Sequence, residues 1–182
     1  MPTTPAHIID FWLEAGRKSW FAKSEAFDRV IRERFETDHH AAARGELDQW
    51  MKSADGALAL ILLLDQFPRN LWRNSAHAFA TDPLARAVAS AAIAVGHDRA
   101  VPSRLRSFFY LPFEHSEDLA DQQHGVELCE AQERETGESA KWARVHRDII
   151  ARFSRFPHRN QCLGRRSTTE ELEFLRGGNF GG

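Results

Sequence analysis

The chain has 182 residues, 42% of them hydrophobic and 27% charged, which is the composition of a globular protein with one substantial core. Its formal net charge of −2 gives no general attraction to nucleic acid or to anionic membranes, so we expect neither as a partner. The longest apolar run has eight residues, too few to cross a bilayer, and the N-terminus lacks a signal peptide's basic start, so we predict a cytoplasmic protein.

The first elements along the chain are two helices and a turn. Thr4 followed by Pro5 predicts the start of a helix that Gly16 ends, because a capping residue before proline favours the first helical turn. Apolar residues at helical spacing predict a second helix over residues 24–44. A short amphipathic turn over residues 47–50 follows.

The segment 55–67, DGALALILLLDQF, is apolar on all sides and is therefore either a buried strand or a buried central helix. Its length and its content of alanine and leucine favour the helix. Pro68 disfavours helical geometry at the residue before it, which predicts that the helix stops at Phe67.

Each of the later predicted helices has its own start or stop signal. They span residues 82–95, opened by Asp82; 103–110, cut off by Pro112; 117–136, capped by Ser116; 139–156, stopped by Pro157; and a last helix opened by the Thr168–Glu171 capping box and ended by Gly177.

No segment shows the alternation of apolar and polar residues that is typical of strands. The predicted fold class is therefore all-α. We expect a single domain of about eight or nine helices over residues 1–176, with short loops pairing sequential helices antiparallel. The glycine-rich residues 177–182 are predicted to be a flexible tail.

Two of the predicted helices end on nearly the same phrase, FPRN at residues 67–70 and FPHRN at residues 156–160. One interpretation is local, because arginine and asparagine placed after a helix stop donate to the carbonyls of its last turn. The other interpretation is a site. Two such loops that converge would present several arginine forks, which bind carboxylate or phosphate with two parallel hydrogen bonds.

A third polar stretch, EHSEDLADQ at residues 114–122, gathers carboxylates and a histidine at a predicted helix start. Such a set is typical of acid–base catalysis or of a metal site, but the second Glu-x-x-His motif of a di-metal bundle is missing. We predict neither a metal nor a cofactor. The alternative is ion pairing, because residues 114–138 hold nine acids and one arginine, whereas residues 141–182 hold nine bases and four acids.

Four phrases together resemble the family known as domain of unknown function 924: LLLDQFPRN, FATDPLA, YLPFEHSEDLADQ and HRDIIARFSRFPHRNQCLGRRST. The chain departs from that pattern at Ser154, where glycine is usual, and at Gln161-Cys162. The resemblance implies a bacterial protein with paired antiparallel helices, described as tetratricopeptide-repeat-like. It implies no established activity, so no catalytic residue is carried over.

The predicted function is the binding of an anionic small molecule in a polar cleft, with enzymatic activity left open. The alternative is a tetratricopeptide-repeat-like scaffold for a protein or peptide partner, in which the same residues form a buried structural network. The acid–base candidates are Glu114, His115 and His158, and the ligand-binding candidates are Asp65, Arg69, Asn70, Arg73, Glu117, Asp118, Gln122, His146, Arg159, Asn160, Arg165 and Ser167.

Overall fold

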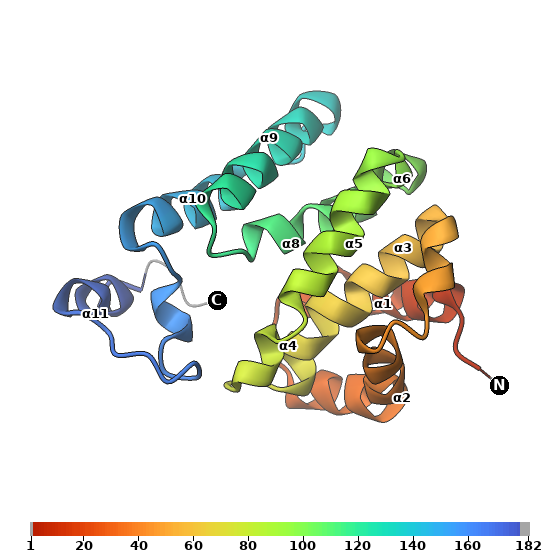
Figure 1. The fold of residues 1–182 in the computed structure, drawn as a ribbon, viewed down its shortest axis with the longest axis horizontal. Coiled ribbons are helices and arrows are strands. Elements are labelled where there is room, and N and C mark those ends of the chain that lie inside the picture. The colour runs from red at the N-terminus through yellow and green to blue at the C-terminus, as the bar shows by residue number, and fades with distance from the viewer. Residues whose placement is uncertain (1, 179–182) are drawn as a thin grey trace. The chain divides into compact units, whose positions relative to one another are not determined.

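The computed structural model describes residues 2–178, and every regular element in that range is helical (Figure 1). The predicted all-α class is therefore confirmed. The chain forms two compact units, which we call unit 1 (Met1–Arg73 and His77–Pro112) and unit 2 (Asn74–Ala76 and Phe113–Gly182). The division into compact units does not show whether they fold together or separately. The single domain over residues 1–176 therefore stays a prediction. Of the predicted tail, residues 179–182 lie outside the described range.

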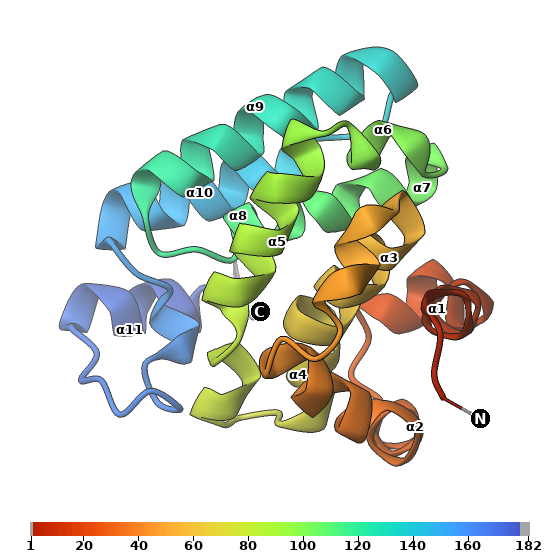
Figure 2. The ribbon, with the colours of Figure 1, turned by 45° about the vertical axis from the view of Figure 1, so that its right-hand side comes forward.

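Unit 1 is built around a buried central rod made of three consecutive helical segments (Figure 2). Its elements are α1 (Pro5–Trp20), α2 (Glu25–Ala43), the 3-10 helix η1 (Asp48–Lys52), α3 (Ala54–Ile61), the π-helix η2 (Leu62–Gln66), α4 (Phe67–Leu71), α5 (Asp82–Ala94), α6 (His97–Ala100), α7 (Ser103–Arg106) and the 3-10 helix η4 (Ser107–Phe109). The rod is α3, η2 and α4. Helices α1 and α5 pack on α3, and α2 packs on α4.

Unit 2 is a pair of longer helices followed by a shorter one. The chain enters it through α8 (Leu111–Glu114) and continues with α9 (Leu119–Thr136), α10 (Lys141–Phe153), the 3-10 helix η5 (Pro157–Arg159) and α11 (Thr169–Arg176). The other segment of unit 2, Asn74–Ala76, ends at the first residue of the 3-10 helix η3 (Ala76–Phe79). Helices α9 and α10 lie side by side and antiparallel in both views, as the short connection between them predicts (Figures 1 and 2).

The helix stop predicted at Phe67 is wrong, because the rod passes through Pro68 and ends at Leu71. Proline normally clashes with the carbonyl four residues before it and has no N–H to donate. Here the helix first widens into the π-helix η2, in which the Phe67 N–H donates to the carbonyl of Leu62, five residues back. The wider turn accommodates the proline ring within a continuous helix.

The widening frees backbone carbonyls in the core, and side chains bond to them. His39 Nδ1 lies 2.8 Å from the Leu63 oxygen, Thr81 Oγ1 lies 2.6 Å from the Leu64 oxygen, and Arg69 Nη1 donates to the Asp65 oxygen. A buried carbonyl without a donor costs about 1–3 kcal/mol. These three residues from α2, the α5 N-terminus and α4 therefore stabilise the irregular turn.

Two predicted helix caps are displaced, because the side chains that were expected to cap make other contacts. The cap of α5 is Thr81 rather than Asp82, whose carboxylate is bonded to Arg69. The cap of α9 is Asp118 rather than Ser116. Ser116 instead donates to the Asp121 carboxylate at 2.6 Å. Pro112 lies inside the short helix α8 and does not cut the helical path.

The helix predicted over residues 139–156 ends earlier, with α10 stopping at Phe153 and Ser154 adopting the left-handed conformation at φ 56°. Glycine adopts that conformation without strain, whereas serine does not, so the departure at Ser154 falls on a position that favours glycine. Gly16 likewise breaks α1 with φ 73°, as its predicted role as a stop requires, before one more helical turn runs to Trp20.

Within residues 2–178, no helix combines the length and the apolar character needed to span a bilayer.

Candidate functional site

The arginines of the first loop, residues 67–73, are bound to carboxylates of unit 1. Arg69 donates to both oxygens of Asp82 at 3.0 and 3.1 Å and also contacts Asp65, which is fully buried. Burial alone would lower the pKa of Arg69, but the charges of Asp65 and Asp82 raise it above its ordinary value. The fork thus links the end of the central rod to the start of α5.

Arg73 and Asn70 share one carboxylate on α2. Arg73 Nη2 lies 2.8 Å from Asp28 Oδ1, Arg73 Nε bonds to the second oxygen, and Asn70 Nδ2 lies 2.8 Å from Oδ1. All four predicted ligand-binding residues of this loop (Asp65, Arg69, Asn70 and Arg73) therefore belong to a network inside unit 1. In this loop the contacts match the structural interpretation.

In the second loop, Glu117 binds Arg165 and the start of η5. Arg165 donates to both carboxylate oxygens at 2.6 and 2.9 Å, and the Phe156 N–H donates to Oε1 at 2.8 Å. Burial raises the pKa of Glu117, but the hydrogen bonds from Arg165 and Phe156, with the charges of Arg165 and Arg159, hold it below its usual range. Glu117 stays ionised at neutral pH.

A second carboxylate in this loop, Glu171 of α11, is almost completely buried. Arg155 binds it with both arms of its fork at 2.6 and 2.8 Å, and the Thr168 N–H donates at 2.7 Å. The hydrogen bond from Arg155, helped by Thr168 and Asn160 and opposed by burial, lowers the pKa of Glu171 to about 2. Asn160 Nδ2 also donates to Ser167 Oγ at 3.1 Å.

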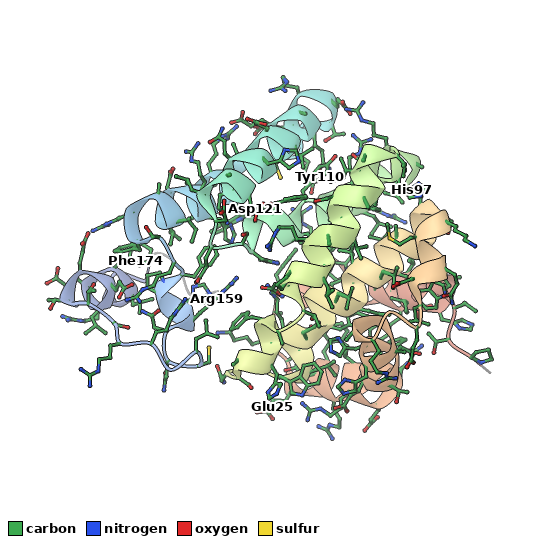
Figure 3. All side chains as sticks on the ribbon, in the orientation of Figure 1. Glu25, His97, Tyr110, Asp121, Arg159 and Phe174 are labelled. Carbon is green, nitrogen blue, oxygen red and sulfur yellow. The ribbon has the colours of Figure 1, made fainter. Side chains whose placement is uncertain are left out.

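We call Arg155, Arg159, Arg165, Glu117 and Glu171 the arginine cluster. Glu117 interacts electrostatically with all three arginines, and Glu171 with Arg155. Figure 3 labels Arg159 on the segment between α10 and α11, where the cluster forms.

Next to this cluster, three histidines gather around the buried ring of Phe156. The His146 ring lies 5.7 Å from the Phe156 ring, His158 lies 5.5 Å from Phe156, and His115 lies 6.4 Å from His146. Glu114 Oε2 lies 3.3 Å from His146 Nδ1. We call these five residues the histidine cluster. The structure thus brings together all three acid–base candidates and His146.

Arg159 joins the two clusters. Its Nη1 donates to the His115 carbonyl at 2.9 Å, and its guanidinium lies 4.4 Å from the centre of the Phe156 ring. Burial, followed by the positive charge of Arg159, lowers the pKa of His158 to about 3. His158 is therefore a neutral imidazole at physiological pH.

Two predicted ligand-binding residues have local structural roles at the start of α9. The Asp118 carboxylate accepts from the N–H groups of Ala120 and Asp121, as an N-cap does. Gln122 Nε2 donates to three carbonyls in the turn before the helix: Phe113 at 3.2 Å, Glu114 at 2.7 Å and Ser116 at 2.7 Å.

Sequence reasoning missed three residues of these clusters: Arg155, Phe156 and Glu171. It also missed the buried Cys129 beside them, whose thiol lies 3.4 Å from Glu114 Oε1. Burial raises the pKa of that thiol, and the neighbouring Glu114 raises it further, so Cys129 stays protonated. The capping box flagged Glu171, but only as a local cap. Its pairing with Arg155 joins residues 16 positions apart, and no local sequence pattern predicts such a pair.

Within residues 2–178, no three His, Cys, Asp or Glu side chains are placed to hold a metal ion. Both cysteines are free thiols.

We predict that Asp65, Arg69 and Asn70 lie near Arg159 and Asn160, because both loops have the same order of residues: phenylalanine, proline, arginine and asparagine. The two sets belong to different units, so this stays a prediction. Spin labels can be placed at Arg73, a half-buried position of the first loop, and at Gln161, an exposed position of the second. Double electron–electron resonance should then give a short distance between the two labels. A distance comparable to the length of the whole protein would contradict it.

The comparisons with known proteins agree with the geometry in giving a fold and no activity. A solved protein of unknown function from Agrobacterium tumefaciens is 52% identical to this chain, with a TM-score of 0.89 over 96% of this chain and 97% of that one. No curated protein matches. The family model described as "Bacterial protein of unknown function (DUF924)" matches residues 8–179. The chain belongs to this bacterial family, domain of unknown function 924.

Proposed function

We propose that the protein binds a small anionic molecule at the arginine cluster of unit 2. The observation that carries the proposal is the gathering of three arginine side chains in one partly buried place of unit 2, where Glu117 interacts with all of them. Guanidinium forks match the geometry of phosphate, sulfate and carboxylate groups.

The first loop is less suited to the same ligand. Arg69 binds Asp82, and Arg73 binds Asp28, each through a carboxylate that already supplies the negative charge. An incoming anion would have to displace a partly buried carboxylate there. The proposal therefore narrows to the second loop, with Arg159 as the principal contact. Arg165, like Arg69 and Arg73, is already bound to a carboxylate, that of Glu117.

The proposal predicts that phosphate or sulfate raises the melting temperature at constant ionic strength, because a ligand that binds only the native state stabilises it by mass action. Arg159→Lys should lose most of that increase, since an ammonium keeps the charge but cannot form a bidentate fork. Arg176→Lys, at the exposed end of α11, is the matched control and should keep it.

The structural alternative gives a different pattern. If Arg159 serves only to hold His115 and Phe156 in place, Arg159→Lys lowers the melting temperature without any ligand. In that case phosphate and sulfate change wild type and variant by the same small amount. That result would contradict anion binding.

A second candidate function, binding of a peptide partner, is favoured by an open groove on unit 2. The groove has a volume of about 290 Å³ and a mostly apolar lining: Val145, Asp148, Ile149, Arg152, Phe153 and Phe174. Peptides selected from a displayed library should lose binding to a Phe174→Ser variant if this groove is the site. If the groove and the arginine cluster act independently, Phe174→Ser should lose peptide binding and should keep the increase in melting temperature that sulfate causes.

A further inference from the structure

One face of α10 carries an apolar stripe that reaches the protein surface. Val145, Ile149 and Phe153 follow one another at intervals of four residues, which places them on one side of the helix. The three residues line the groove of about 290 Å³ in unit 2, together with Phe174 of α11. Trp142 continues the stripe one turn toward the N-terminus and is 57% exposed. The groove thus belongs to a longer apolar surface on one helix.

The lining of this groove is held in place by the core of unit 2. Ile149 is buried in the same cluster as Ile150 and Phe156. Phe174, labelled in Figure 3, packs against Phe153 with the two ring centres 5.1 Å apart. A partner would therefore meet a preformed surface, and little ordering of side chains would oppose its binding.

Two charges of opposite sign lie on the same face of α10. Asp148 and Arg152 are four residues apart, both line the groove, and their side chains are 67% and 53% exposed. Asp148 pairs with Arg147, and Arg152 pairs with Glu170 of α11. Ion pairs in contact with solvent contribute little to stability, so Asp148 and Arg152 can exchange their partners at small cost.

The order of these charges favours one kind of partner. The two positive and two negative side chains at the groove cancel, so a partner with a strong charge of one sign gains nothing. A second copy of α10 in antiparallel orientation is complementary. A two-fold axis through the middle of the stripe places Asp148 of each copy opposite Arg152 of the other. It also brings the Val145 end of each helix to the Phe153 end of the other, so apolar side chains meet.

We propose that the groove of unit 2 binds a second copy of this chain, and that two copies form a symmetric dimer through antiparallel α10 helices. The inference does not rest on anion binding, because the groove contains no residue of the arginine cluster. It assigns the groove to a copy of the chain instead of a foreign peptide. The 13 residues of α10 span only about 20 Å, so the dimer should exchange with the monomer.

Sedimentation equilibrium of the full chain, at protein concentrations up to about 1 mM, measures this association. Wild type should show a monomer–dimer equilibrium. Asp148→Arg places positive charges opposite each other at two points of the interface, and Arg152→Asp places negative charges opposite each other. Each variant should weaken dimerisation about tenfold or more, because like charges meet where opposite charges paired.

The decisive measurement combines the two changes. A mixture of Asp148→Arg with Arg152→Asp brings a positive pair on one copy against a negative pair on the other, so a heterodimer should form. The double variant only exchanges the two signs and should dimerise like wild type. Glu127→Arg is the matched control, because Glu127 lies on α9, is 64% exposed and undergoes the same change of charge. It should leave dimerisation unchanged.

Three results would overturn the inference. A protein that stays monomeric at every concentration leaves the groove to a peptide partner. A dimer that persists in both single variants uses another surface. Loss of the dimer without recovery in the mixture and in the double variant shows that Asp148 and Arg152 do not meet. The response to sulfate keeps anion binding separate, because a wild type that dimerises without gaining thermal stability from sulfate contradicts anion binding alone.

Hydroxyl-radical footprinting of the unaltered protein gives a test that needs no variant. Oxidation of Phe153 and Phe174 should fall as the concentration rises into the range of the dimer, because the second copy covers both rings. Phe21 of unit 1 is 63% exposed and serves as the control, since its oxidation should not change. Equal oxidation of Phe153 and Phe174 in monomer and dimer would place the interface elsewhere and overturn the inference.

Discussion

Replacing Leu62 or Leu63 by alanine is expected to lower the free energy of unfolding by about 2–5 kcal/mol. Both side chains lie in the π-helix η2 and have no exposed surface. Each deletion removes buried apolar atoms and leaves a cavity. The rod cannot easily relax into that space, because side chains from α2, the α5 N-terminus and α4 hold its carbonyls.

Leu84→Ala is the matched control, because Leu84 lies on α5 in the same unit and is 45% exposed. It should change the free energy of unfolding by much less. Urea unfolding followed by tryptophan fluorescence suits this comparison, since four of the five tryptophans belong to unit 1: Trp12, Trp20, Trp50 and Trp72. Midpoints that hardly move in both rod variants would mean that η2 is not central to stability.

Replacing Glu171 by glutamine is expected to remove about 2–3 kcal/mol of stability at neutral pH, and the loss should vanish in acid. Arg155 and Thr168 lower the pKa of Glu171 from 4.5 to about 2. Because the folded pKa is the lower one, the stabilisation is fully present above about pH 4.5. It is lost as the pH falls toward 2, where the folded protein also takes up the proton.

Glu170→Gln controls for the loss of one negative charge on α11. Glu170 pairs with Arg152, but both side chains are more than half exposed, so the pair contributes little. Urea titrations between pH 6 and pH 2 should show wild type and Glu171→Gln converging, while Glu170→Gln runs parallel to wild type. A stability difference between wild type and Glu171→Gln that does not change with pH would contradict the assigned pairing.

Neighbouring residues decide most of what could be predicted about the helices. A Thr-Pro start, a glycine at a left-handed position and a capping box each act within one helical turn, and α1, α2 and α11 begin where such signals stand. The errors have different origins. At Pro68 the rod widens into the π-helix η2 and continues, and at Asp82 a contact with Arg69 of α4 outweighs the local preference. At Ser116 the hydroxyl bonds to the Asp121 carboxylate five residues on, and Asp118 caps the helix.

The candidate site shows the same division. The sequence indicated which residues matter in the second loop, because FPHRN and EHSEDLADQ concentrate arginine, histidine and carboxylates in two phrases. It left open whether an arginine faces a carboxylate or a ligand. Charges in residues 114–138 and 141–182 predicted ion pairs between the acidic and basic segments, and Arg144 with Glu130 and Glu133 confirms that interpretation.

The sequence by itself determined the all-helical class, the buried central segment and the family, because each depends only on the order of residues along the chain. Only the tertiary structure decided that Asp28 and Asp82 bind the arginines of the first loop. It alone also placed Glu114 against His146 of another helix. These pairs join residues 13 to 45 positions apart, and their energies depend on burial and on ångström distances that exist only after the helices have packed.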